Sequence, residues 1–152
     1  MASFSNFLTT PGRLFIDKTK YIEVLDKVGD YSYMFLRPRR FGKSTFLDTL
    51  CKYYDIAEGD SFSDLFGGLY IGSNPTKYRN SHLVLKLNLS SINISRDINC
   101  TRRAFNQTIN DVLERFLQKY RRFLGDGWTF ETVLSENASV SLWNVLVGAH
   151  LL

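Results

Sequence analysis

The stretch YSYMFLRPRRFGKSTFLDTLCKYYDI, residues 31–56, contains the change of pattern that decides the expected fold. Its first part, Tyr31 to Leu36, is a compact apolar and aromatic run of the kind that forms a buried strand. Pro38 ends this run, because proline has no backbone N–H to donate to a neighbouring strand. From Lys43 onward the apolar residues follow helical spacing, at Phe46, Leu47, Leu50, Cys51 and Tyr54. The stretch therefore predicts a strand, a basic loop and a helix, in that order.

The basic loop carries part of a phosphate-binding pattern. Loops with the pattern G-x-x-x-x-G-K-[ST] turn successive backbone N–H groups toward phosphate oxygens at the positive end of the next helix. Gly42, Lys43 and Ser44 occupy its last three defined places. The first place holds Arg37, where glycine is usual because a side chain can hinder the turn. Two interpretations follow from the residues: a site for nucleotide phosphates, or a basic surface turn.

The segments on either side of this stretch have their own patterns. Tyr21 to Val28 has the apolar spacing of a short helix that closes at Gly29. Residues 57–80 are rich in Gly, Ser, Asn and Asp and predict a structured loop. The apolar residues of that loop are expected to attach it to the core; they are Phe62, Leu65, Phe66 and Leu69.

The second half of the chain predicts a strand followed by a long helix. SHLVLKLNLSS, residues 81–91, alternates leucines with other residues, which is the period of a strand. Asp97 to Leu124 has a broad apolar stripe opposite charged residues and predicts an amphipathic helix that ends at Gly125-Asp-Gly. A shorter helix is expected around Phe130 to Leu134.

Strand, basic loop, helix, strand and long helix form the order of an α/β unit, in which crossover helices join parallel strands. The chain of 152 residues has the size of one ordinary domain. We therefore expect the α/β class, P-loop NTPase-like, with a partial parallel sheet flanked by helices, in a single domain over residues 1–152. No secretory signal and no apolar run of ~18 residues is visible. We accordingly expect an intracellular, cytoplasmic protein that does not bind a membrane.

Two motifs extend the interpretation. Phe15-Ile-Asp-Lys-Thr precedes the short helix, and FLRPRRFGKS occupies residues 35–44. Together they resemble the VDKT and FLRPRRFGKS motifs of the AAA-ATPase-like family, whose members usually carry a C-terminal PD-(D/E)XK nuclease-like domain. The resemblance continues through TFLDTL and FGGLYI and into the strand that begins at His82. Arg37 is then the family's own version of the loop. For Asp17 and Lys18 the residues themselves suggest a helix cap and a surface charge.

The resemblance implies a site for ATP and Mg²⁺. Gly42, Lys43, Ser44 and Thr45 would form its phosphate and magnesium end, with Ser44 as the Mg²⁺ ligand. Arg40 and Phe41 would contribute backbone N–H groups. Arg37 and Arg39 would either add charge near the phosphates or lie on plain surface.

Hydrolysis would need more than this site. An acidic residue at the end of a later strand, the Walker B position, holds the Mg²⁺ water shell, and another group orients the attacking water. Family members are expected to read roughly LIDEYD there, but the candidate strand Val145-Leu-Val-Gly-Ala-His carries no carboxylate. His150 does not replace it, because Mg²⁺ prefers oxygen ligands. The acidic residues closer to the loop are Asp48, Asp55, Asp60 and Asp64, and Asp48 is expected to face solvent.

We therefore expect the N-terminal portion of the family's domain, acting as an ATP-binding module with weak or no hydrolysis and with catalytic residues that the sequence does not identify. The alternative is a non-enzymatic remnant or interaction module that binds nucleic acid or an acidic protein through arginine clusters, consistent with the net charge of +4. The later basic clusters read as solvated helix faces; they are Arg102 and Arg103, then Lys119, Arg121 and Arg122. Neither the nucleotide preference nor the oligomeric state follows from the sequence.

Overall fold

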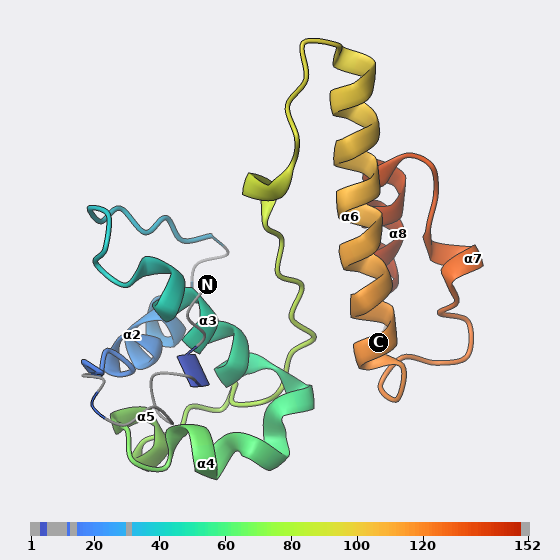
Figure 1. Cartoon of the computed structure of the whole chain (residues 1–152). Coiled ribbons are helices and arrows are strands. Elements are labelled where there is room, and N and C mark those ends of the chain that lie inside the picture. Colours follow the sequence, from blue (N-terminus) through green and yellow to red (C-terminus); the bar gives the residue numbers. More distant parts are fainter. Residues whose placement is uncertain (1–3, 6–11, 13–14, 30–31, 150–152) are drawn as a thin grey trace. The chain divides into compact units, whose positions relative to one another are not determined.

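A computed structural model describes residues 4–5, 12, 15–29 and 32–149. The chain divides into two compact units, Met1–Val84 and Leu85–Leu152 (Figure 1). The first unit contains α2 (Lys20–Val28), α3 (Lys43–Tyr54), the 3₁₀ helix η1 (Ile56–Ser61), α4 (Phe62–Phe66) and α5 (Tyr70–Ser73). The second contains the 3₁₀ helix η2 (Leu89–Ser91), α6 (Ile98–Tyr120), α7 (Phe130–Val133) and α8 (Ala138–Ala149).

The two helices that flank the basic loop confirm the sequence prediction. Helix α2 ends at Gly29, whose φ of 68° lies in the left-handed region and whose N–H donates to the carbonyl oxygen of Leu25. Helix α3 begins at Lys43, as its apolar spacing predicts. A hydrogen bond of 2.6 Å from the Tyr54 hydroxyl to Oδ1 of Asp26 joins the end of α3 to α2. The two helices that lead to and from the loop are thus held together.

An aromatic core stabilises the first unit. Its buried members are Phe4, Ile22, Tyr53, Phe62, Phe66 and Ile71. The ring of Phe66 lies 5.2 Å from that of Phe4, 5.2 Å from that of Phe62 and 5.7 Å from that of Tyr53, between centroids. Such pairs contribute roughly 0.5–1.5 kcal/mol each beyond the burial of their area. This core fixes α3 against the segment that follows it.

The segment 57–80 is more regular than expected. The sequence predicts a structured loop there, but α4, α5 and all of η1 except Ile56 lie in it. The attachment to the core is confirmed, because Phe62 and Phe66 are buried, and Leu65 and Leu69 pack partly buried against the core. Short helices form here because the apolar residues are spaced three or four apart, so one turn of helix places them on one side.

The predicted α/β fold class is wrong for the described residues. No named strand occurs among them, and the pairing they show is one isolated parallel bridge between Asp55 and His82. Residues 32–38 have no regular secondary structure, and every one of them is exposed. Met34 and Leu36 expose 83% and 80% of their surface. A strand is stabilised by neighbours that accept and donate its backbone hydrogen bonds, and apolar composition alone does not supply them.

The second expected strand is also absent from the described chain. Residues 83–88 lack regular structure and lead into η2. The leucine alternation does not separate a buried from an exposed side, because Leu83, Val84 and Leu85 are all half-buried and Leu87 and Leu89 are exposed. A period of two specifies a strand only where one face meets a core.

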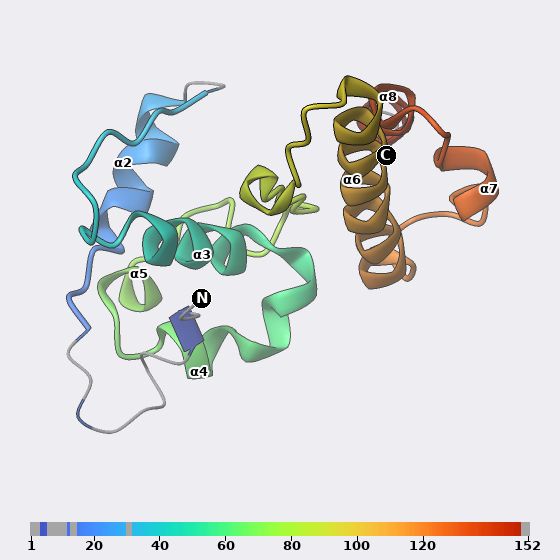
Figure 2. The same cartoon turned by 45° about the horizontal axis from the view of Figure 1, so that its top comes forward.

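The second unit is built on α6, the predicted long helix. Its N-cap Asp97 accepts a hydrogen bond from the Asn99 N–H at 2.9 Å, and its buried residues are Ile109, Leu113, Phe116, Leu117 and Tyr120. The helix ends at Tyr120, before the predicted Leu124, and Gly125 lies beyond its end. Figure 2 shows α8 alongside α6, as does Figure 1. The predicted helix near Phe130 is confirmed as α7.

Residues 145–149 correct a third strand prediction. They belong to α8, so the candidate strand Val145-Leu-Val-Gly-Ala is helical, and His150 lies outside the described residues. Short apolar runs are ambiguous between helix and strand, and here the helix begins seven residues upstream, at Ala138. No helix within residues 4–5, 12, 15–29 and 32–149 is both long and apolar enough to cross a membrane.

Candidate functional site

The backbone of the basic loop alternates in handedness. Among the described residues other than glycine, positive φ angles occur at Arg40, 68°, and Asn80, 47°. Gly42 follows with a φ of 75°, and Phe41 between them keeps a negative φ. When neighbouring residues have right-handed and left-handed backbone conformations in turn, their successive N–H groups point toward one side and form an anion-binding concavity. Arg37 has a negative φ as well, so the loop does not need glycine at that position.

The start of α3 adds further donors to the loop. Gly42 is the N-cap and offers no side-chain acceptor, and the first intrahelical bond runs from the Phe46 N–H to the Gly42 carbonyl oxygen at 2.8 Å. The N–H groups of Lys43, Ser44 and Thr45 precede that bond and have no acceptor within the helix. They carry the positive end of the helix dipole. Donors suited to an anion therefore continue from the loop into the first turn.

The side chain of Lys43 folds back over the loop. Its Nζ donates to the carbonyl oxygens of Arg37 and Pro38, the latter at 3.0 Å. The ammonium group thus lies at the beginning of the loop although the residue stands at its end. A phosphate oxygen is a stronger acceptor than a carbonyl oxygen, since ionised partners make stronger hydrogen bonds. The same ammonium can therefore exchange two carbonyls for a phosphate.

The Asp17-Lys-Thr motif is anchored by its first and third residues. Asp17 Oδ1 accepts from the N–H and the hydroxyl of Thr19 at 2.8 and 2.7 Å, and Asp17 Oδ2 accepts from the Tyr70 N–H at 2.8 Å. The Thr19 hydroxyl oxygen accepts from the Ile71 N–H at 3.2 Å. These bonds join the start of α2 to the start of α5. Asp17 therefore does not occupy the N-cap of α2, which is Thr19, but accepts from that residue and from the first N–H of α5.

The hydrogen bonds to Asp17 also act on its ionisation. Burial works to raise the pKa of the Asp17 carboxyl, but the bonds from the Thr19 hydroxyl, the Tyr70 N–H and the Thr19 N–H outweigh it. The pKa of this carboxyl is consequently lower than its usual value. Asp17 remains ionised at neutral pH and keeps accepting from both helices.

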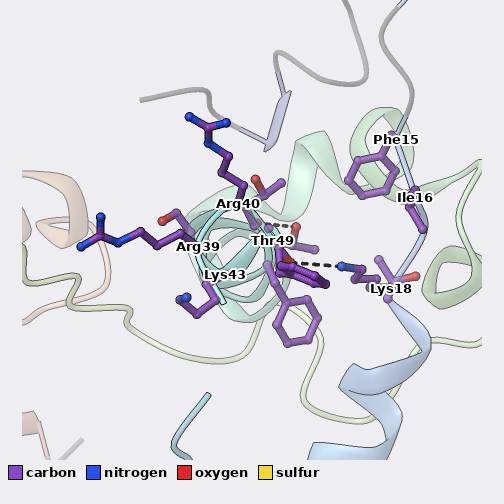
Figure 3. A pocket seen from close by; sticks show the side chains of 13 residues that line it. Phe15, Ile16, Lys18, Arg39, Arg40, Lys43 and Thr49 are labelled. Atoms are coloured by element: carbon purple, nitrogen blue, oxygen red, sulfur yellow. Dashed lines mark hydrogen bonds between the residues drawn. The ribbon is translucent and has the colours of Figure 1, made fainter. Parts of the chain in front are cut away.

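Lys18, the middle residue of the motif, extends toward the loop. Its Nζ donates to the Phe41 carbonyl oxygen at 3.2 Å across 23 residues of sequence (Figure 3). A Cβ built on Gly42 would lie 3.8 Å from the same nitrogen. The expectation of a surface charge is therefore incomplete, because the half-buried side chain contacts the loop that carries the phosphate pattern.

Residues of both the motif and the loop line a cavity of about 690 Å³. Its size falls in the usual range of small-molecule sites. Of the candidate residues it brings together Arg39, Arg40, Phe41, Gly42, Lys43, Ser44 and Thr45, and it leaves out Arg37. Sequence reasoning missed its other lining residues, which are Phe15, Ile16, Lys18, Thr19, Phe46 and Thr49. The Asp17-Lys-Thr motif was the signal that could have identified this second wall.

The arginines of the loop extend away from the Lys18 side. Figure 3 shows the guanidinium groups of Arg39 and Arg40 pointing away from Lys18, and both residues are exposed. The later basic residues lie on the second unit, close to the two ends of α6, and are exposed as expected of solvated faces. Arg103 and Lys119 are separated by roughly 24 Å along the helix axis at 1.5 Å per residue. They do not make one basic patch on that helix.

The acidic residues named as substitutes do not line the cavity. Asp48 was expected to face solvent, but it is half-buried and its Oδ2 accepts from the Phe4 N–H at 2.8 Å. Asp55 is buried, and its Oδ1 accepts from the Ala57 N–H at the start of η1. Asp60 and Asp64 are exposed. The prediction for Asp48 was wrong because position along a helix does not reveal that the N-terminal segment packs beside it.

The donor set of the cavity fits Mg²⁺ that arrives with phosphate. The hydroxyl groups of Ser44 and Thr45 line the cavity, and oxygen is the ligand type that this metal prefers. Mg²⁺ usually keeps several waters and takes one or two protein ligands together with substrate phosphates. Across the described ranges, no cluster of three or more His, Cys, Asp or Glu side chains forms a metal site by itself.

Comparison with known proteins gives one match. A family model described as a predicted AAA-ATPase, AAA-ATPase-like, matches residues 1–147. No curated protein and no solved structure matches the chain. The family model covers both the loop and the Asp17-Lys-Thr motif, so both walls of the cavity lie within the matched region.

Proposed function

Because the chain belongs to the predicted AAA-ATPase family, we propose that its first unit binds ATP with Mg²⁺ in the cavity beside the loop. One observation carries the proposal: the left-handed Arg40 and Gly42, the start of α3 and the residue Lys43 all line the same cavity. Each of these features alone is common, but together they supply backbone donors, a dipole and a mobile cation for a phosphate chain.

The chain's own residues divide the work of binding. The N–H groups from Phe41 to Thr45 bind phosphate oxygens, and Lys43 moves from the carbonyls of Arg37 and Pro38 to the outer phosphates. Ser44, which lines the cavity, would hold through its hydroxyl the Mg²⁺ that accompanies the phosphates. When bound, the ion neutralises phosphate charge and draws the outer phosphates into one arrangement.

We propose binding with little turnover. Hydrolysis requires a group that orients the attacking water, commonly a carboxylate or an amide. The thirteen residues that line the cavity include neither an acidic side chain nor Asn or Gln. A measurement of phosphate release by the purified chain tests this part separately. Release at the rate of free Mg–ATP is expected, and sustained multiple turnover would contradict it.

The binding proposal is tested by calorimetric titration with Mg–ATP of the wild-type chain and two variants. Lys43→Ala removes the ammonium on the loop, whereas Lys77→Ala removes an exposed lysine of the same unit that lies over the Tyr78 ring, away from the cavity. We expect saturable one-site binding, at least about tenfold weaker in Lys43→Ala, as for loss of a charged hydrogen bond, and unchanged in Lys77→Ala. Circular dichroism confirms that all three proteins are folded.

A folded wild-type chain that binds no Mg–ATP would contradict the proposal. In that case the alternative, binding of nucleic acid or an acidic protein by the arginines, becomes the better account. It predicts an affinity that falls steeply with salt concentration, because neutralised phosphates release their counterions. Binding of single-stranded oligonucleotide at two salt concentrations separates the two functions.

A further inference from the structure

We infer that Lys18 is a positioning residue of the phosphate loop, which it serves by holding the peptide bond between Phe41 and Gly42 in one orientation. The inference deepens the proposed function and rests on it. It starts from the hydrogen bond of 3.2 Å from Lys18 Nζ to the Phe41 carbonyl oxygen. This is a contact between the two walls of the cavity.

The base of the Lys18 side chain is fixed on both sides. Asp17 and Thr19 bind each other and the first two N–H groups of α5, and the Lys18 carbonyl oxygen accepts from the Tyr21 N–H at 3.1 Å as α2 begins. Thr19 is 1% exposed, so its bonds are protected from water. A flexible side chain that projects from a fixed backbone reaches a defined volume, and its end lies at the Phe41 carbonyl.

The bond to Phe41 has a consequence for Gly42. No cis peptide bond occurs among the described residues, and in a trans peptide the C=O and the following N–H point in opposite directions. Holding the Phe41 carbonyl toward Lys18 therefore directs the Gly42 N–H to the opposite side. This N–H is the last donor of the loop before α3 begins.

Glycine makes such a hold necessary. Gly42 has a φ of 75°, but glycine adopts negative φ as readily, so the peptide before it can flip at little cost. A flipped peptide would turn the Phe41 carbonyl oxygen away from Lys18 and toward the donors of the loop. A partial negative charge would then face the bound anion. The ammonium of Lys18 opposes the flip by stabilising one orientation.

The test measures the φ angle of Gly42, which becomes negative if the preceding peptide flips. Three-bond couplings between amide and α protons, which report φ, are compared in the ¹⁵N-labelled chain without nucleotide among wild type, Lys18→Met, Lys18→Arg and Lys20→Met. Methionine keeps the length of the side chain and removes its donors, whereas arginine keeps both charge and donors. Lys20→Met removes an equal charge two residues away, from an exposed lysine that does not line the cavity.

We expect the Gly42 coupling to change in Lys18→Met and to match wild type in Lys18→Arg and Lys20→Met. Couplings within α3 and α6 should stay the same in all four proteins, which shows that each one is folded. Titration with Mg–ATP should then give an affinity about tenfold weaker for Lys18→Met alone, as for loss of a charged hydrogen bond.

The outcomes separate this inference from the proposed function. An unchanged Gly42 coupling in Lys18→Met overturns the inference whatever the affinity, because a loss of affinity alone would mean direct contact between Lys18 and ATP. A changed coupling with wild-type affinity overturns it too, since the held orientation would then not serve binding. A changed coupling in a chain whose wild type binds no Mg–ATP supports Lys18 as the hold of the loop and rejects the proposed function.

Discussion

At the scale of single residues, the loop depends on backbone conformations that most side chains avoid. Arg40 and Gly42 are both left-handed. Lys18 donates to the carbonyl oxygen of Phe41 between them, and Lys43 donates to two carbonyl oxygens that precede them. A left-handed residue with a Cβ costs roughly 1–2 kcal/mol. The surrounding hydrogen bonds hold Arg40 in this conformation despite its cost. Residues held in such strained conformations cluster at functional sites.

Gly42→Ala should destabilise the protein by about 1–2 kcal/mol through the backbone, since the new methyl group would have ordinary contact with Lys18 at 3.8 Å and no clash. Gly59→Ala is the matched control, because its φ is not in the left-handed region and its nearest neighbour is 4.0 Å away; a change within about 0.5 kcal/mol is expected there. Urea denaturation measures both. Equal losses in the two variants would contradict the argument.

Asp17 predicts a pH dependence of stability. Because its folded-state pKa lies below the ordinary value of 3.8, its contribution is complete above that value and is lost as the pH falls through the folded-state pKa. The unfolding free energy of wild type should exceed that of Asp17→Asn at neutral pH, and the difference should shrink in acid. Denaturation at several pH values between about 2.5 and 7 covers this titration. A difference that grows as the pH falls would show that the sign is wrong.

Residue identity alone predicted the loop better than its partners. The pattern from Arg39 to Thr45 identified one wall of the cavity, because a phosphate loop is local in sequence. The reach of Lys18 to Phe41 spans 23 residues, and no spacing rule connects them. The same limit applies to Asp48, whose partner is the distant Phe4 N–H.

At the scale of elements, helices and strands differed in how far the sequence predicted them. Helices α2, α3, α6 and α7 follow from apolar residues spaced three or four apart, a signal that each segment carries by itself. A strand needs a neighbouring strand, and no named strand occurs among the described residues. The apolar run near Val145 fits either structure by itself, and in the longer α8 it is helical.

The exposed segment before the loop gives a direct test of this correction. Leu36→Ala should change the unfolding free energy by no more than about 0.5 kcal/mol, because the side chain is 80% exposed. Leu113→Ala on α6 removes a fully buried leucine and should cost about 2–5 kcal/mol. Chemical denaturation of both variants measures the contrast. A loss of the second size at Leu36 would mean that a buried strand forms after all.

At the scale of the whole molecule, the proposed nucleotide site belongs to the first of the two units. Every residue that lines the cavity lies between Phe15 and Thr49, within the first unit. The buried aromatic core also consists only of residues of the first unit, from Phe4 to Ile71. The length of the chain predicts one domain, and this stays a prediction beside the two compact units.

A chain that ends at Val84 should therefore fold cooperatively and bind Mg–ATP with the affinity of the full chain, because it keeps both walls of the cavity and the aromatic core. Thermal unfolding followed by circular dichroism and a titration with Mg–ATP measure the two properties. A folded fragment that has lost binding would show that residues beyond Val84 contribute to the site.

The central claim is that nucleotide phosphates bind at the loop and the first turn of α3. The most direct measurement follows the backbone amide resonances of the ¹⁵N-labelled chain during titration with Mg–ATP, and with adenosine as the control that lacks phosphates. The account predicts that the amides from Phe41 to Thr45 shift with Mg–ATP and not with adenosine. Shifts confined to the basic ends of α6, or none in a folded chain, would contradict it.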